Sequence, residues 1–245
     1  MKKNLALIPG AGILLACHLA FAGPADYVYT PTVEQGEREI DVKFGHWNTN
    51  AAQPQTDSSI GLGYGVNAWW FTEIYMKRRK ANGQLTTYDA TEWENKFQLT
   101  ETGRFPMDIG FLLEIERPRD HADGWEVKYG PLFQTEFGKV QLNANLLFER
   151  KYHAQISSTT ELGYQWQAKY RWLSVFEFGL QGFGNVGKWS DWAPESERGN
   201  RLGPAVFGKI PLGGRQAIKY NAAWLIGTSS AAPRRNIRVQ MEYEF

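Results

Sequence analysis

The sequence predicts an all-β protein, a single closed, antiparallel transmembrane β-barrel of about twelve strands. Three observations lead to this prediction. Segments of about ten residues alternate apolar and polar side chains, and successive side chains of a strand point to opposite faces. The apolar faces carry almost no charge through their middles. The connections alternate between short turns and longer polar loops, as they do in barrels that cross a membrane.

The first 22 residues have the pattern of a secretory signal peptide. Two lysines precede an apolar run from Leu5 to Leu19, and small residues up to Ala22 suit cleavage at that point. The only cysteine, Cys17, lies inside this run, and lipidation there is the alternative processing. Cleavage after Ala22 divides the chain into a signal peptide, 1–22, and a barrel domain, 23–245, which then has no disulfide.

Twelve segments carry the alternation after an irregular lead-in at residues 23–35. The predicted strands are 37–47, 60–66, 70–77, 92–100, 107–116, 126–137, 140–149, 161–171, 176–181, 202–210, 218–226 and 236–245. Short turns are expected at 67–68, 102–105, 138–139, 173–174 and 212–215. Longer polar loops are expected between the other strands, the first at 48–57 and the longest at 188–200. An even number of strands places both ends of the barrel domain on the same side.

A soluble β-barrel or sandwich also alternates, and the position of the charges distinguishes the two classes. A soluble fold buries its apolar face, whereas a transmembrane barrel turns that face to lipid and keeps it free of charge. The mature chain has no run of about 18 apolar residues for a membrane helix. The 10 Trp, 11 Tyr and 14 Phe suit aromatic girdles at the two membrane surfaces. We therefore favour the membrane barrel.

The last strand places Ile237, Val239, Met241, Tyr243 and Phe245 on one face and polar residues on the other. In this strand the chain resembles the Gram-negative outer-membrane β-barrel proteins, whose final strand typically ends in a Phe that their assembly machinery reads. The resemblance implies export to the outer membrane and contact with its lipids. It also implies recognition of Tyr243 and Phe245 by the barrel-assembly machinery, with periplasmic short turns and extracellular longer loops.

The inward faces of the predicted strands are densely charged, with more acids than bases. One interpretation is a hydrated, mildly cation-preferring pore for small polar solutes. The other is a narrow lumen closed by charge pairs, which gives a structural or surface-interaction barrel without conductance. The sequence leaves both open. The residues expected to line the lumen are Glu92, Glu94, Lys96, Asp108, Glu114, Glu116, Glu126, Lys128, Lys169 and Arg171.

Basic residues gather beside the longer loops. If those loops are extracellular, guanidinium groups there could bind the phosphates of lipopolysaccharide bidentately; ordinary solvated loop charge is the alternative. The candidates for lipopolysaccharide contact are Arg78, Arg79, Arg117, Arg119, Arg150, Lys151, Arg234 and Arg235, and Arg198 and Arg201 form a further basic pair.

The sequence does not favour an enzyme. Some twelve-stranded outer-membrane barrels hydrolyse lipids with a His and a Ser at the rim, and His46 lies near Ser58 and Ser59 as His153 lies near Ser157 and Ser158. Neither set has the close pairing that such a site needs. We expect no metal site and no cofactor. The net charge of +1 gives no case for nucleic acid.

Overall fold

The computed structural model describes residues 23–48, 54–81 and 84–245, so the predicted signal peptide lies outside the described part. Its strands are β1 (Arg38–Asn48), β2 (Gln55–Asn67), β3 (Trp70–Ala81), β4 (Thr87–Gln98), β5 (Asp108–Pro118), β6 (Trp125–Phe137), β7 (Val140–Tyr152), β8 (Glu161–Leu173), β9 (Phe176–Lys188), β10 (Asp191–Trp192), β11 (Arg201–Gly213), β12 (Gln216–Gly227) and β13 (Arg235–Glu244). Two 3-10 turns, His121–Asp123 and Glu195–Glu197, lie in loops.

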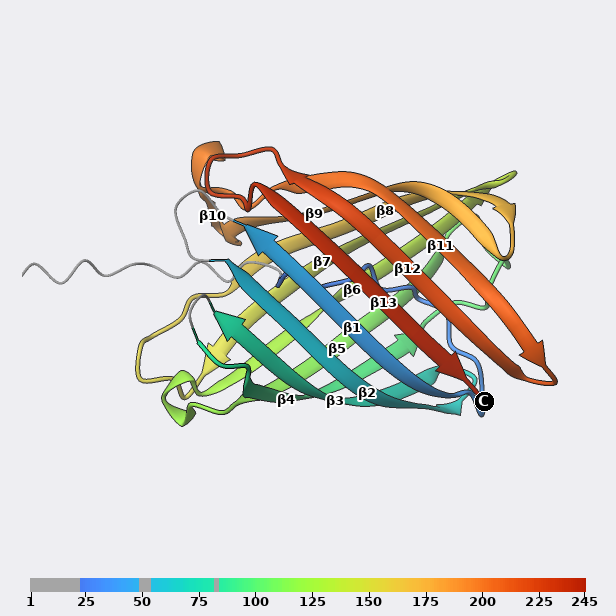
Figure 1. Cartoon of the computed structure of the whole chain (residues 1–245), viewed down its shortest axis with the longest axis horizontal. Helices are drawn as coiled ribbons and strands as arrows, with labels where there is room; N and C mark the ends of the chain where they lie inside the picture. The colour runs from blue at the N-terminus through green and yellow to red at the C-terminus, as the bar shows by residue number, and fades with distance from the viewer. Residues whose placement is uncertain (1–22, 49–53, 82–83) are drawn as a thin grey trace, which may run out of the picture.

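Twelve long strands form a closed antiparallel ring (Figure 1). Each strand pairs with the next along the chain, β9 pairs with β11, and β13 closes the ring on β1. The two-residue β10 pairs only with the end of β9. Among the described residues, closure leaves no unpaired edge on the twelve long strands, which is the condition for a sheet to lie in hydrocarbon. The predicted fold class and strand number are therefore confirmed.

The outer surface of the ring is a broad apolar belt. Val42, Leu62, Ile74 and Met241 are among many apolar side chains that are exposed on it. Exposed aromatic residues lie near both ends of the strands, namely Trp69, Phe137, Trp172, Phe176 and Phe245 at one end and Tyr88, Trp125, Tyr152, Trp189 and Trp192 at the other. Such a belt between aromatic girdles fits a lipid bilayer. Within the described residues no helix is long and apolar enough to cross a membrane.

The observed strands differ from the predicted ones mainly at their ends. β2 begins at Gln55 and β4 at Thr87, about five residues earlier than expected, and β9 continues to Lys188. Polar residues at these ends continue the hydrogen-bonded ladder, as Thr56 does opposite His46. The turn expected at 102–105 lies within a longer connection at 99–107. We call the end with the β2–β3, β6–β7, β8–β9 and β11–β12 turns the short-turn end and the opposite end the loop end.

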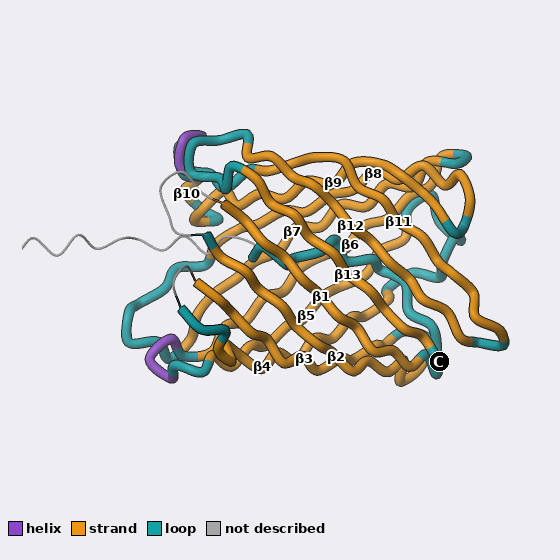
Figure 2. Tube along the Cα trace, in the orientation of Figure 1, coloured by secondary structure: helices purple, strands orange, loops and turns teal. Residues whose placement is uncertain are grey.

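The lead-in before β1 runs inside the barrel. Residues 23–37, named the luminal segment, form a coil that crosses the interior along the strands (Figure 2). Its first residues lie towards the loop end, where Pro24 touches Gly45 and Asn236. Its last residues lie at the short-turn end, where Gly36 donates to the Gly65 carbonyl over 2.8 Å.

Glycines in the wall make room for this coil. A Cβ at Gly45 would lie 2.0 Å from the Pro24 carbonyl oxygen, and one at Gly110 would lie 2.8 Å from Pro31 Cβ. Only a residue without a side chain allows the backbone to approach so closely.

The lipid-facing belt yields a stability prediction. Val42→Arg places a charge in the middle of the outward face of β1, and we expect it to lower the free energy of unfolding by about 2 to 4 kcal/mol. Unfolding by denaturant in phospholipid vesicles measures this. Asn48→Arg, at the end of the same outward face, should cost about 0 to 1 kcal/mol, and Val42→Leu should be nearly neutral. Equal costs for the two arginine variants would contradict a membrane belt.

Candidate functional site

The lumen is lined by buried polar and charged side chains from every part of the ring. Acids and lysines predominate on β3 to β6 and amides on β7 to β9, and the buried arginines Arg201 and Arg238 lie on β11 and β13. The buried members include Glu39, Asp41, Lys43, Glu73, Glu92, Glu94, Asp108, Glu114, Glu116, Gln134, Asn143, Asn145, Gln165, Gln167, Gln181, Arg201, Arg238 and Gln240. Because an isolated buried charge costs several kcal/mol, these groups must be paired or hydrated.

On the β3–β7 side, lysines bridge the acids. The Lys77 ammonium contacts the carboxylates of Glu92, at 2.8 Å, and Glu116. The Lys128 ammonium contacts Glu114 at 2.9 Å and Glu149 at 4.0 Å. Cross-strand register places Glu92 opposite Glu116, so the lysine between them offsets a repulsion that would otherwise act across the β4–β5 ladder.

The luminal segment is attached to this acidic wall through two tyrosines. Tyr27 donates to Glu94 over 2.7 Å, and Tyr29 donates to Glu114 over 2.9 Å. The Lys43 ammonium lies 3.6 Å from the centre of the Tyr27 ring, in cation–π geometry. These contacts give Glu94 a hydrogen-bond donor and give Glu114 a second partner beside Lys128.

Further contacts hold the segment from β7 and from β11. Asn145 donates to the Tyr29 carbonyl over 3.1 Å, and Arg201 donates to the Gly23 carbonyl over 2.9 Å. Apolar side chains also point inward. Tyr29 packs on Leu112, Leu132 and Leu147, and Val28 packs with Phe183, Ala205, Phe207, Ala223 and Leu225. The segment thus covers apolar wall that an empty lumen would expose to water.

A ladder of amides joins the remaining strands. Gln141 and Asn143 donate to Gln134, Gln167 donates to Asn143, and Gln181 donates to Gln167. Arg238 extends the ladder, and Gln240 ends it on Asp41. Each amide is used as donor, acceptor or both, so the ladder fixes the orientation of these side chains.

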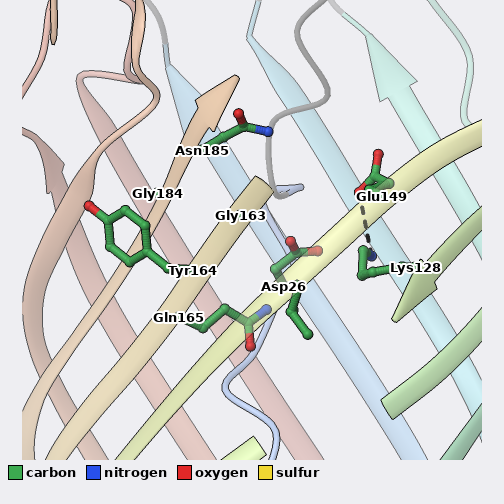
Figure 3. Close-up of a pocket in the computed structure, with 9 residues that line it drawn as sticks. Asp26, Lys128, Glu149, Gly163, Tyr164, Gln165, Gly184 and Asn185 are labelled. Atoms are coloured by element: carbon green, nitrogen blue, oxygen red, sulfur yellow. Dashed lines mark ion pairs between the residues drawn. The ribbon is translucent and has the colours of Figure 1, made fainter. Parts of the chain in front are cut away.

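A cavity of about 30 Å³ lies between Asp26, Lys128, Glu149, Tyr164 and Asn185 (Figure 3). This volume holds about one or two water molecules.

A second charged cluster lies at the short-turn end. The Lys219 ammonium contacts Glu37 at 3.2 Å and Glu242 at 3.7 Å, and it also pairs with Glu244. Lys209 contacts Glu244 at 2.7 Å. Burial raises the pKa of Glu37, which precedes β1, and Lys219 partly offsets this rise. The carboxylates of Glu37, Glu39 and Glu244 come close enough together to suit a cation. The ammonium groups of Lys209 and Lys219 lie beside them.

Comparison with known proteins bears on the fold. No protein-family model matches the chain, and no curated protein matches its sequence. An outer-membrane channel from Pseudomonas putida F1 is similar in structure, with a TM-score of 0.57, 12% identity and coverage of 89% of this chain and 98% of the other. The NanC porin is similar with a TM-score of 0.55, 10% identity and coverage of 84% and 98%. The fold is that of an outer-membrane β-barrel.

The outer-membrane barrel places the predicted lumen residues on its inner side, although their role in conduction remains a prediction. Eight of the ten lie on β4, β5 and β6, and most are buried there. Lys169 and Arg171 lie on β8 near the short-turn end, where they contact Glu177 at 3.0 and 3.7 Å. The ring contact of Lys96 is with Phe71, at 5.0 Å.

The eight basic residues proposed for lipid contact separate into two groups. Arg79 lies on the inner side and pairs with Asp57 and Asp89, at 3.4 and 3.0 Å, and Lys151 lies 3.8 Å from Glu126. The other six, Arg78, Arg117, Arg119, Arg150, Arg234 and Arg235, lie on the outer face or in loops at the loop end. Their contact with lipopolysaccharide remains a proposal.

In the part of the chain that the structure describes, the ring of His46 is hydrogen-bonded to a threonine. The His46 Nδ1 atom is 2.9 Å from the Thr56 hydroxyl, whereas the register pairs Ser58 with Phe44 and Ser59 with Lys43. His153 is exposed in the β7–β8 loop with a φ of 58°.

Three features of the lumen were not found from the sequence. The path of the luminal segment was missed because residues 23–35 have no periodicity. The inward Leu112, Leu132 and Leu147 could have been found, since each adjoins another apolar residue and so breaks strict alternation. Arg201, grouped with the loop residues, is 3% exposed inside the lumen, as the outward Leu202 would indicate.

The tyrosine contacts yield a prediction about closure. Val28→Cys would introduce the only thiol of a chain cleaved after Ala22, at a position 6% exposed. Adding Tyr27→Phe and Tyr29→Phe removes two donors to buried carboxylates, each worth about 1 to 3 kcal/mol. We therefore expect labelling of the thiol by a charged, water-soluble thiosulfonate to become at least about tenfold faster. Tyr129→Phe, on the outer face, is the matched control, and equal rates in all variants would contradict the proposed attachment.

Proposed function

We propose that the protein is a narrow outer-membrane channel for small polar solutes, held closed by the luminal segment in the described conformation. The observation that carries this proposal is the way in which the luminal segment fills the barrel. The centre of the lumen is occupied by a coil bound through side chains and a few backbone contacts. The coil is not a strand of the wall, so it can leave while all twelve strands remain paired.

The chemistry of the wall supports this proposal. The inner face carries the lysine–acid pairs, the amide ladder and the buried Arg201 and Arg238. Water could solvate these groups if the coil moved. In an eight-stranded barrel the wall side chains can fill the interior. A ring of twelve strands is wider than that. The NanC porin and the outer-membrane channel have similar folds, which supports the general point that a barrel of this kind can conduct.

A second candidate is a permanently closed structural barrel. It is favoured by the packing of Val28 and Tyr29 on inward apolar residues. Opening would expose this apolar surface at a cost of about 25 cal/mol per Å². Conductance measurements separate the two candidates.

We expect the mature protein, refolded into a planar bilayer, to be closed for most of the time and to open rarely. The double variant Tyr27→Ala and Tyr29→Ala removes the two phenol–carboxylate hydrogen bonds and both tyrosine rings of the coil, so its open probability should rise at least about tenfold. Single-channel recording measures this change.

Controls make that result interpretable. Tyr129→Ala and Tyr152→Ala, which change only the outer face, should leave the open probability unchanged. A folded double variant that never conducts would contradict the channel and favour the closed barrel.

The acidic wall predicts a mild preference for cations in the open state. Glu114→Gln and Glu116→Gln remove two buried carboxylates, so the reversal potential in a salt gradient should move towards zero. The changes are best introduced into the variant with Tyr27→Ala and Tyr29→Ala, since that variant is expected to conduct. An unchanged reversal potential would show that these acids do not set selectivity.

A further inference from the structure

Two buried arginines stand together near the loop end of the lumen. Arg201, the first residue of β11, is 3% exposed, and Arg238 on β13 is 1% exposed. Their guanidinium carbons lie 5.1 and 5.8 Å from the centre of the same Phe183 ring. Arg201 also lies 5.4 Å from the centre of the Trp47 ring. Aromatic faces thus hold both planar groups in the lumen.

Both guanidinium groups have unused hydrogen-bond donors. Arg201 donates from Nη2 to the Gly23 carbonyl, and Arg238 donates from Nη1 to Gln181 and Asn221. Among the described residues, Nε and Nη1 of Arg201 and Nε and Nη2 of Arg238 have no partner. Neither arginine forms an ion pair with a described acid. This differs from the opposite wall, where Lys77 and Lys128 are paired with carboxylates.

An acid of the luminal segment lies near the pair without bonding to it. Asp26 attracts both guanidinium groups electrostatically, and Asp41 also attracts that of Arg238. Asp26 is close to Gly23, whose backbone carbonyl accepts from Arg201. The segment therefore brings a carboxylate close to the two arginines and covers one of them.

The geometry points to an anion site formed by Arg201 and Arg238, whose ligand is the carboxylate of a small organic solute. Four buried donors without partners are costly, and a carboxylate accepts from a guanidinium through two parallel hydrogen bonds. Asp26 acts as the internal competitor of that solute. The inference rests on the proposed channel, since it names a class of solute that would enter from the loop end.

The test measures binding directly and needs no conductance. L-lactate is titrated into the mature protein in detergent micelles, with propane-1,2-diol as the neutral solute of the same shape, and saturation-transfer NMR reports binding. Lactate should bind and the diol should not. Asp26→Asn removes the competing charge, so the affinity for lactate should rise several-fold.

Arginine variants locate the site. Arg201→Gln and Arg238→Gln should each weaken lactate binding about tenfold or more, because each removes charge-assisted hydrogen bonds. Arg201→Lys and Arg238→Lys keep the charge and lose the planar fork, so they should weaken binding less. Arg235→Gln, an exposed arginine on the same strand as Arg238, should have no effect.

The outcomes separate this site from the channel. Absence of lactate binding in the wild type, in Asp26→Asn and in Tyr27→Phe with Tyr29→Phe would overturn the site, even if the protein conducts. Binding that survives both glutamine variants would also overturn it. Binding that depends on the arginines, in a protein that never conducts, would support the site and reject the channel.

Discussion

The structure depends on one geometric constraint: a sheet in hydrocarbon must close on itself, and closure with twelve strands encloses more space than the wall side chains can fill. The outer face has a simple solution, since apolar residues meet lipid. The inner face needs partners for charges from every strand. Long side chains such as Lys77 span between strands, and the luminal segment occupies the centre. The charge pairs and the luminal segment together fill the interior of this wide ring and provide partners for its charges.

Far fewer contacts hold the luminal segment in the lumen than hold the strands of the wall together. β1 and β13 are joined by a continuous ladder from Glu39 to Asn48. The luminal segment is held mainly by two phenol–carboxylate bonds, side-chain donors to its carbonyls and two apolar contacts. Local opening costs less than global unfolding when its contacts are few. On the proposed function, this difference allows a gate to move within a stable frame.

The sequence predicted the barrel wall because apolar and polar side chains alternate along its strands with a period of two residues. Outward Val42 and inward Asp41 follow from alternation alone, and uncharged outer faces indicated lipid. Strand ends were wrong where polar residues such as Thr56 continue the ladder beyond the membrane belt. The segment could not be placed, because its contacts join residues far apart in the chain, as between Tyr29 and Asn145. No local pattern encodes a contact between an aperiodic coil and a distant wall.

The two walls of the lumen differ in a way that links closure to solute binding. On the β3–β7 side, the acids Glu92, Glu94, Glu114 and Glu116 have lysines or tyrosines as partners when the segment is in place. On the β11–β13 side, Arg201 and Arg238 keep free donors although Asp26 lies near them. A carboxylate solute that engages those donors would compete with Asp26 for the same field. Since a ligand shifts an equilibrium only through differential affinity, such a solute would favour the conformation in which the coil has withdrawn.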